Sequence, residues 1–209
     1  DLFFPLSEPL FYDYYNEPSS QDLSSGLFNA FVHNMNNEYN SMKAKGGTFA
    51  DFDLDGDMDL YYGYTSGHYF ENINSSHFIE RTQLYDINNS GSRGIIAGDL
   101  DNNGYPDIVK WRDQFSSSYS HIALLNRGNH QFDRINYMNS SLLIDLHSQG
   151  LIDVDLDGDL DLVAVERDGQ AQFHCFKNNG LDDSGNIIFE NIYSYERTDE
   201  TSSSRTLAI

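Results

Sequence analysis

Three short acidic segments of this chain follow one pattern, Asp-x-Asp-x-Asp/Asn-Gly-x-x-Asp. They occupy residues 51–59, 99–107 and 153–161, and their first residues lie 48 and 54 positions apart. Carboxylates at alternate positions of a short loop converge on one centre, and the glycine at position 6 permits the sharp turn that such a loop needs. The period therefore predicts a repeat protein in which each of these units carries a cation site.

Ca²⁺ is the ion that this loop chemistry favours, because it takes roughly six to eight oxygen ligands at flexible geometry. Mg²⁺ keeps its waters and prefers octahedral sites, so it fits less well. Side chains at positions 1, 3, 5 and 9 and the backbone carbonyl of position 7 are the expected ligands. The three predicted calcium sites comprise Asp51, Asp53, Asp55, Asp57 (carbonyl) and Asp59; Asp99, Asp101, Asn103, Tyr105 (carbonyl) and Asp107; and Asp153, Asp155, Asp157, Asp159 (carbonyl) and Asp161.

The second loop has one carboxylate fewer than the other two, because its fifth position is Asn103. Since the charge of the ligands tunes calcium affinity, we expect the second site to be the weakest. Two other interpretations remain open. An EF-hand would need a glutamate at position 12 between two helices, where this chain has Tyr62, Lys110 and Ala164. The loops could also be acidic surface turns that hold no metal.

Apolar runs precede and follow each loop, and two more come after further turns. They are rich in aromatic and β-branched residues and are bounded by Gly, Asn, Ser and Asp, which is typical of strands. Four strands in a unit of about fifty residues predict an all-β chain of β-propeller blades. The expected strands are 48–50, 60–62, 68–70 and 77–80; 95–97, 108–111, 122–125 and 131–134; and 151–152, 162–165, 172–176 and 188–190.

Both ends of the chain resemble parts of the repeat. Residues 1–4 are similar to 59–62, and residues 205–209 are similar to 93–97. We therefore expect about four blades' worth of one propeller domain, 1–209, and infer a segment of a longer chain. Closure of a four-bladed ring by the last strand is the alternative. The expected divisions are a partial blade 1–46, blades 47–92, 93–149 and 150–203, and the first strand of a next blade, 204–209.

The loops and their flanks support a family resemblance. Residues 47–60 (GTFADFDLDGDMDL) resemble the VCBS/FG-GAP repeat of integrin-α-like β-propellers, as do residues 96–101 and 152–162. The resemblance implies a seven- or eight-bladed propeller with Ca²⁺ in its outer blade loops. It also implies an extracellular protein that acts in adhesion, in carbohydrate binding, in a large surface assembly or beside an enzyme. A minority of calcium-containing propellers are polysaccharide lyases.

The charge of the chain limits its partners. The formal net charge is −21, and three bound Ca²⁺ ions would offset six of these charges. Nucleic-acid binding needs basic surfaces, and anionic membranes repel an acidic protein, so neither partner is expected. No apolar stretch is long enough to insert into a membrane. Weak calcium sites fill outside the cell but not in the cytosol, which favours an extracellular or cell-surface location.

Nothing in the sequence selects a catalytic group. Seven histidines form no zinc pattern, and there is no Gly-x-Ser-x-Gly elbow or phosphate loop. His68 and His121 are expected at equivalent places at the start of third strands, which indicates a structural role. A lyase would use a His or Tyr base, and the seven histidines and fourteen tyrosines leave that open.

The sequence thus favours a non-enzymatic, calcium-stabilised propeller of an extracellular adhesion or structural protein, with a protein or glycan partner at its rim or face. A lectin or polysaccharide lyase is the alternative, and a metal-free intracellular scaffold is a third. The aromatic run 11–15 is a candidate contact surface, although it could equally belong to a blade core. Cys175, in an apolar run, is expected to be a buried thiol rather than a reactive one. Asn-x-Ser sequons occur at Asn74, Asn88 and Asn139.

Overall fold

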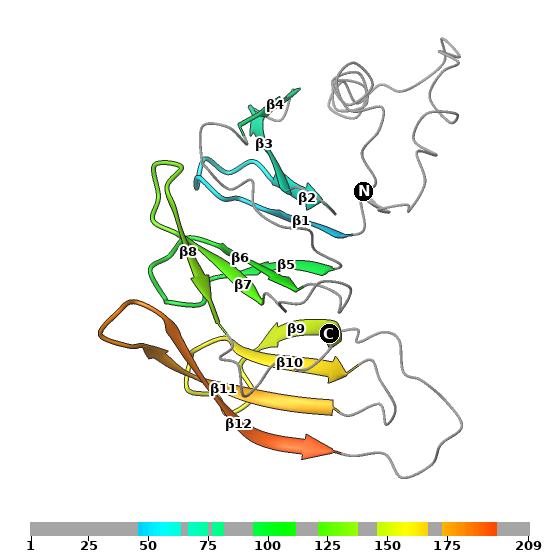
Figure 1. The fold of residues 1–209 in the computed structure, drawn as a ribbon. Coiled ribbons are helices and arrows are strands. Elements are labelled where there is room, and N and C mark those ends of the chain that lie inside the picture. The colour runs from blue at the N-terminus through cyan, green and yellow to red at the C-terminus, as the bar shows by residue number, and fades with distance from the viewer. Residues whose placement is uncertain are drawn as a thin grey trace, which may run out of the picture. The chain divides into compact units, whose positions relative to one another are not determined.

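A computed structural model describes residues 46–63, 67–74, 77–81, 94–111, 121–137, 146–166 and 173–195. These residues form twelve β-strands in three four-stranded antiparallel sheets, with no helix among them (Figure 1). Accordingly, nothing in the described part of the chain is a helix that could span a membrane. The partial blade, the aromatic run 11–15 and the last expected strand lie outside the described residues.

The strands agree closely with the expected repeat of four. The first sheet consists of β1 (Gly46–Ala50), β2 (Asp59–Gly63), β3 (Gly67–Ile73) and β4 (His77–Glu80). The second consists of β5 (Gly94–Gly98), β6 (Asp107–Trp111), β7 (Ile122–Asn126) and β8 (Phe132–Asn136). The third consists of β9 (Leu146–Ile152), β10 (Asp161–Glu166), β11 (Phe173–Leu181) and β12 (Ile187–Tyr195).

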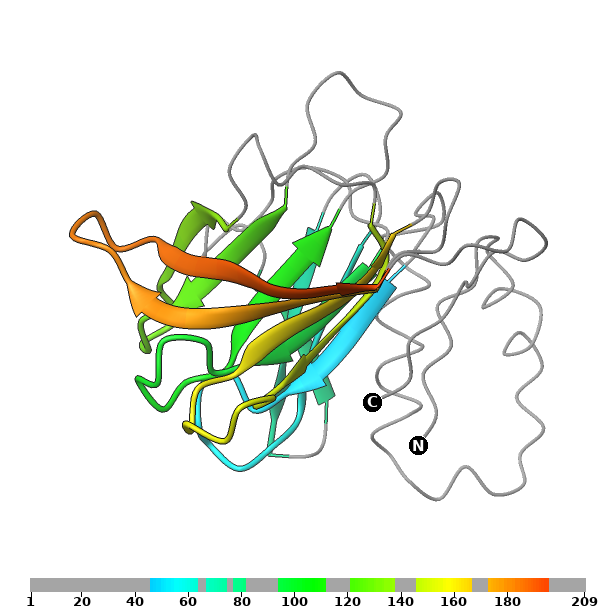
Figure 2. The ribbon, with the colours of Figure 1, turned by 90° about the horizontal axis from the view of Figure 1, so that it is seen from below.

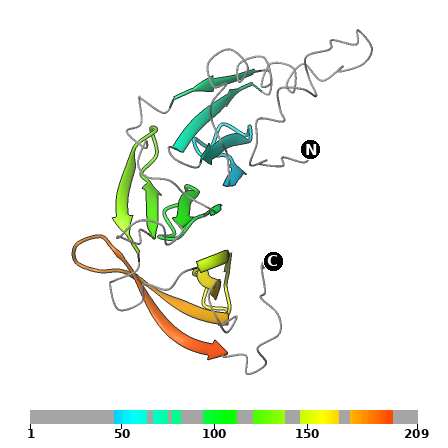
Figure 3. The ribbon, with the colours of Figure 1, turned by 45° about the vertical axis from the view of Figure 1, so that its right-hand side comes forward.

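The chain divides into two compact units, residues 1–92 and 93–209. Unit 1 holds the sheet β1–β4, and unit 2 holds the sheets β5–β8 and β9–β12. Within every sheet the strands lie side by side in the order of the sequence, so each is a simple meander (Figure 3). All three sheets therefore share one connectivity, as repeats of one structural unit should.

Each acidic loop joins the first strand of a sheet to the second. The pairs Ala50↔Asp59, Gly98↔Asp107 and Ile152↔Asp161 close the three hairpins, so the ninth loop residue is always the first residue of the second strand. That second strand is buried along nearly all of its length in every sheet. A central strand with both faces covered needs apolar residues in succession, which explains the unbroken runs that follow the loops.

One hydrophobic core joins the two sheets of unit 2. Trp111, Leu125 and Tyr137 from the second sheet belong to the same buried cluster as Leu162 and Phe176 from the third. The Tyr137 hydroxyl also donates a 2.8 Å hydrogen bond to Gln149 Oε1 on β9. The sheets approach closely at Gly98, where a Cβ atom would lie 2.8 Å from the side chains of Leu151 and Leu160. A larger residue there would have to displace the ends of these two leucine side chains.

The third sheet departs in detail from the expected strands. β9 begins at Leu146, before the expected blade start at residue 150, and it carries an irregular register between Val165 and Glu166 of β10. β11 and β12 are nine residues long and extend into a hairpin that projects beyond the rest of the sheet (Figure 2). The register shifts twice along this pair, at bulges that alternation along a strand does not reveal.

Candidate metal centre

The three acidic loops share one backbone conformation. Position 6 is a glycine with φ of 96°, 93° and 99°, at Gly56, Gly104 and Gly158. Position 4 is also left-handed, although it is not glycine, with φ of 63°, 56° and 63° at Leu54, Asn102 and Leu156. Leucine rarely adopts this region, so the surrounding hydrogen bonds must impose it. The sequence pattern predicted the glycine but gave no signal for position 4.

The aspartate at position 1 orders the turn in each loop. Asp51 Oδ1 accepts the N–H of Asp55 at 3.0 Å, and its Oδ2 accepts the N–H of Gly56 at 3.0 Å. The same two bonds recur in the other loops, at 3.1 and 2.8 Å to Asp99 and at 3.1 and 3.0 Å to Asp153. One carboxylate thus holds the middle of the loop with both oxygens.

The aspartate at position 9 is fully buried and joins the loop to the third strand. Asp59 accepts the N–H of Phe52 in the loop at 3.0 Å and that of Asn72 on β3 at 2.8 Å. The same pattern recurs in the other sheets, from Leu100 and Asn126 to Asp107 (2.8 and 2.6 Å) and from Val154 and Asn178 to Asp161 (2.8 and 2.8 Å).

The asparagine in this pattern also donates its side-chain amide to the carbonyl of loop position 8. The distance is 3.1 Å in each sheet, from Asn72 to Met58, from Asn126 to Pro106 and from Asn178 to Leu160. The structure places these asparagines in or at the end of the third strand, where they hold the loop.

Burial makes the position 9 carboxylates costly to ionise. Desolvation raises the pKa of Asp59 and Asp107 to about 7, although the backbone N–H groups that they accept act in the opposite direction. A cation beside such a carboxylate lowers its pKa again. The electrostatics of these two loops therefore favour a bound positive ion.

Carboxylate oxygens of positions 1, 3 and 9 converge in every loop. Within each set, one oxygen from each residue lies within 4.8 Å of the others; the sets are Asp51, Asp53 and Asp59; Asp99, Asp101 and Asp107; and Asp153, Asp155 and Asp161. Oxygens that bind one Ca²⁺ at roughly 2.4 Å are at most about 4.8 Å apart, so this spacing suits that ion. The structure thus brings together three of the predicted ligands of each site.

Position 5 makes a different contact. Asp55, Asn103 and Asp157 each accept the N–H of the residue at position 7, at 2.9, 2.9 and 3.0 Å. Their side chains therefore close the turn next to the converging carboxylates. Their role as ligands, and that of the carbonyls of Asp57, Tyr105 and Asp159, stays a prediction.

An unsatisfied oxygen supports a cation in the second loop. Asp101 is nearly buried, with 2 % of its side chain exposed, and its Oδ1 has no hydrogen-bond partner. Leaving a buried carboxylate oxygen without a partner costs free energy. An ion held with Asp99 and Asp107 would satisfy it, so the residues present fit a hard cation.

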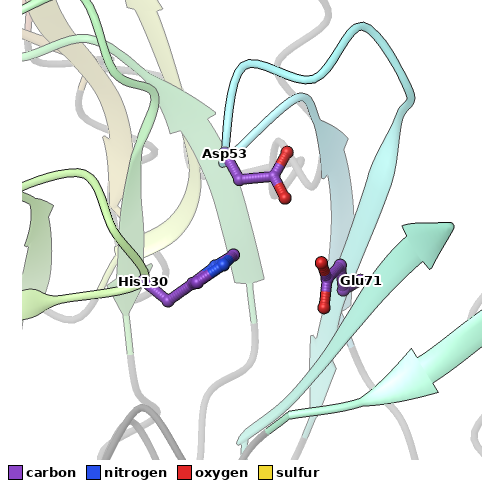
Figure 4. Close-up of side chains that lie close together, drawn as sticks. All are labelled: Asp53, Glu71 and His130. Carbon is purple, nitrogen blue, oxygen red and sulfur yellow. The ribbon is translucent and has the colours of Figure 1, made fainter.

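The charges next to position 3 differ among the loops. In the first loop Asp53 faces Glu71 of β3, and their carboxylate oxygens lie within 4.8 Å (Figure 4). In the second loop Asp101 forms an ion pair with Arg127, and in the third loop Asp155 forms one with Lys177. The loop motif does not predict this difference, because Glu71, Arg127 and Lys177 lie outside it, on the third strand or just after that strand.

The described histidines inside the sheets have structural environments. His68 is buried, with its Nδ1 2.8 Å from Glu80 Oε1, and burial lowers its pKa to about 4. His174 is buried with its Nδ1 2.9 Å from Ser194 Oγ. His68 and His174 occupy equivalent positions, because each pairs with the fourth residue of the second strand of its sheet. The expected equivalence of His68 with His121 is wrong, because His121 precedes β7.

The comparisons with known proteins agree with this geometry. Residues 51–109 match the model of the FG-GAP-like repeat family, and they begin at the first acidic loop and end just after the second. No curated protein gives a significant match to the chain. The resemblance drawn from the loops is confirmed over residues 51–109, which form an FG-GAP-like repeat.

Proposed function

We propose that this chain is a calcium-stabilised segment of a β-propeller in an extracellular or cell-surface protein, and that it binds a protein or glycan partner without catalysis. The observation that carries the proposal is the threefold recurrence of one loop with converging carboxylates. The unpartnered Oδ1 of Asp101 supports it in the second loop. FG-GAP-like repeats are typically extracellular, where calcium is abundant enough to fill such sites.

Calcium would act here as a structural ion. Positions 1, 3 and 9 would hold it, and position 9 is hydrogen-bonded to the third strand in every sheet. The ion would supply the positive charge that these carboxylates lack, and so fix the junction of the first three strands. Because it binds only the folded loop, it adds to the free energy of unfolding.

The first experiment measures calcium itself. Isothermal titration of the metal-free chain should give up to three Ca²⁺ per molecule, and thermal denaturation should show a higher Tm in Ca²⁺ than in Mg²⁺ or EDTA. The combined substitution Asp53→Asn, Asp101→Asn and Asp155→Asn should abolish the difference. Asp182→Asn is the matched control, since Asp182 lies in an ordinary acidic turn and accepts N–H groups of Ser184 and Asn186. If the triple variant kept the wild-type difference in Tm between Ca²⁺ and EDTA, the proposal would be contradicted.

The loop surface supports a binding role. Leu54 and Leu156 occupy position 4 of the first and third loops, and 51 % and 87 % of their surfaces are exposed. Met58, also in the first loop, is 57 % exposed. Single exposed apolar residues are common, but Leu54 and Leu156 recur at one position of a loop that calcium would order. Such side chains can anchor a partner at the rim.

A printed glycan array tests the recognition. We expect binding in Ca²⁺ that is lost in EDTA and weakened at least about tenfold by Leu54→Ser with Leu156→Ser, without a lower Tm. Calcium-independent binding, or binding that the double variant leaves unchanged, would contradict rim recognition. An array without any signal would redirect the search to a protein partner.

The lyase alternative has its own test. A lyase releases an unsaturated sugar, so incubation with uronate polysaccharides would produce ultraviolet absorbance, whereas binding alone would not. Three of the described histidines are buried: His68 and His174 within the sheets, and His121 just before β7. We therefore expect no absorbance, and an increase would favour the enzyme.

A further inference from the structure

The three loops differ in the charge that faces their carboxylates, and this difference predicts how they respond to calcium. The residue just before the loop-binding asparagine of the third strand is Glu71, Leu125 and Lys177 in the three sheets. The residue just after it is Ile73, Arg127 and Asn179. The second and third loops each gain a cationic neighbour in this way, from different positions, and the first loop gains a carboxylate.

Lys177 lies across the third loop. Its Nζ donates to Asp157 Oδ2 at 2.7 Å and also contacts Asp155 Oδ2. These carboxylates are positions 5 and 3 of the loop, two of the predicted calcium ligands. The lysine therefore already occupies oxygens that a metal would use.

Arg127 plays the corresponding part in the second loop. Its Nη1 contacts Asp101 Oδ2, and its Nε donates to Asp133 Oδ2 at 2.8 Å. The second contact fixes the guanidinium to Asp133, which lies on β8. Asp101 thus has one oxygen paired with a cation and the other without a partner.

The first loop shows the opposite arrangement. Glu71 is nine-tenths buried on β3, and Arg81 Nε donates to its Oε2 at 2.6 Å. Arg81 therefore binds Glu71. The third strand thus presents a carboxylate to the first loop, whereas the third strand of the last sheet presents the ammonium of Lys177 to the third loop.

We propose that Arg127 and Lys177 are resident counter-cations of the second and third loops: they hold the loop carboxylates together without metal and weaken calcium binding there. The inference rests on the calcium proposal and adds a control on affinity. The second loop, with only three carboxylates and Arg127, should bind calcium more weakly than the third loop.

The magnitude follows from the charges involved. A fixed positive charge a few ångströms from a divalent cation repels it. At the high effective dielectric of a protein surface, this repulsion corresponds to about a tenfold change in the Kd for calcium. Removing the resident cation should therefore tighten binding at its own loop by about that factor. The same removal should loosen the metal-free loop, because its carboxylates then repel one another.

Three glycine amides allow each loop to be followed separately in the whole chain. Gly56, Gly104 and Gly158 each donate their N–H to the position 1 aspartate of their own loop, at 3.0, 2.8 and 3.0 Å. A calcium titration monitored by ¹⁵N–¹H NMR therefore gives one midpoint per loop. In the wild type we expect Gly158 to respond at a lower Ca²⁺ concentration than Gly104.

The test compares Lys177→Met and Lys177→Arg with the control Arg134→Met, which removes an exposed cation from β8. Lys177→Met should lower the midpoint of Gly158 about tenfold, leave that of Gly56 unchanged and lower the Tm in EDTA. Lys177→Arg, which keeps the charge, and Arg134→Met should both stay within about twofold of the wild type. Arg127→Met should act on Gly104 in the same way.

Two results would overturn the inference in distinguishable ways. If Lys177→Met leaves the midpoint of Gly158 unchanged or raises it, Lys177 is not a competitor, although calcium binding itself stands. If none of the three amides of the wild type responds to Ca²⁺, the calcium proposal fails and this inference fails with it.

Discussion

The side-chain amide of Asn178 donates a 2.8 Å hydrogen bond to the backbone carbonyl of Leu100, which lies 78 residues earlier in the chain. The same amide group donates to the carbonyl of Leu160, and the backbone N–H of Asn178 donates to Asp161. One buried residue of β11 therefore holds its own acidic loop and also the loop of the neighbouring sheet. The two loops of unit 2 are mechanically linked through it.

Asn178→Ala should consequently destabilise unit 2. The substitution leaves two buried carbonyls without their donor, and each such loss costs about 1–3 kcal/mol, so we expect the free energy of unfolding to fall by about 2–4 kcal/mol. Urea denaturation of the whole chain measures it. The adjacent Asn179→Ala is the matched control, because Asn179 is exposed and donates to the exposed Glu190. Equal losses for both variants would show that the link between the sheets contributes nothing.

The buried carboxylates of Asp59 and Asp107 predict a pH dependence. Their folded pKa of about 7 lies above the unfolded value of about 4, so the folded state holds these protons more tightly. Their contribution to the stability of the metal-free protein is complete below about pH 4 and is lost as the pH rises through about 7. Calcium favours the ionised form, so the loaded protein should escape this loss.

The measured quantity is the difference between the Tm in Ca²⁺ and the Tm in EDTA. His68, whose pKa is lowered to about 4, makes stability rise with pH instead. Because it does so both in Ca²⁺ and in EDTA, its effect cancels when the two Tm values are subtracted. We expect the difference to grow from about pH 5 to about pH 8, and calcium binding near pH 6 to release protons. Calorimetry in two buffers of different ionisation enthalpy detects that release. A difference that is constant across this range would contradict the assignment of the position 9 carboxylates to the metal site.

Gly94 and Trp111 make a separate prediction about the second sheet. They are paired across β5 and β6, and a Cβ on Gly94 would lie 1.7 Å from Trp111 Cζ2. Gly94→Ala should therefore destabilise the chain by about 1–3 kcal/mol through overpacking. The cost should shrink in a Trp111→Leu background, where the ring is absent. A double-mutant cycle in urea measures this coupling, and strict additivity would show that the two residues do not clash.

The sequence predicted the strands and loops well for a physical reason. Alternate carboxylates, a glycine and a following apolar run are local features, and each repeats in every unit. The role of Asn72, Asn126 and Asn178 could not be predicted, because they lie 13, 19 and 17 residues after the aspartate that they bind. Connections of different length between the second and third strands remove the fixed spacing that a repeat search uses.

The two resident cations could not be predicted from the sequence, for a related reason. Arg127 and Lys177 stand on opposite sides of equivalent asparagines, so no alignment of the repeats places them together. Their equivalence is seen only in the structure, where Arg127 pairs with Asp101 and Lys177 pairs with Asp155. The early β9 and the bulges of β11 and β12 likewise depend on tertiary packing rather than on local alternation.

Asn103 gives the last prediction, and here the structure changes what the motif alone implies. By charge alone, Asn103→Asp should simply strengthen the second site. However, Asn103 Nδ2 donates to the carbonyl of Asn126 at 2.7 Å, and an aspartate would place a carboxylate oxygen against that carbonyl. We therefore expect the metal-free variant to lose about 1–3 kcal/mol, while its gain in Tm on adding calcium exceeds that of the wild type.

Thermal denaturation in EDTA and in Ca²⁺ separates these two effects. Asn129→Asp is the control, because Asn129 lies on the exposed turn after β7 and carries the same change of charge. It should change neither the free energy of unfolding without metal nor the stabilisation by calcium by more than about 0.5 kcal/mol. If Asn103→Asp were as stable as the wild type in EDTA, the bond to Asn126 would be dispensable. If its calcium response were no larger, position 5 would not be a ligand.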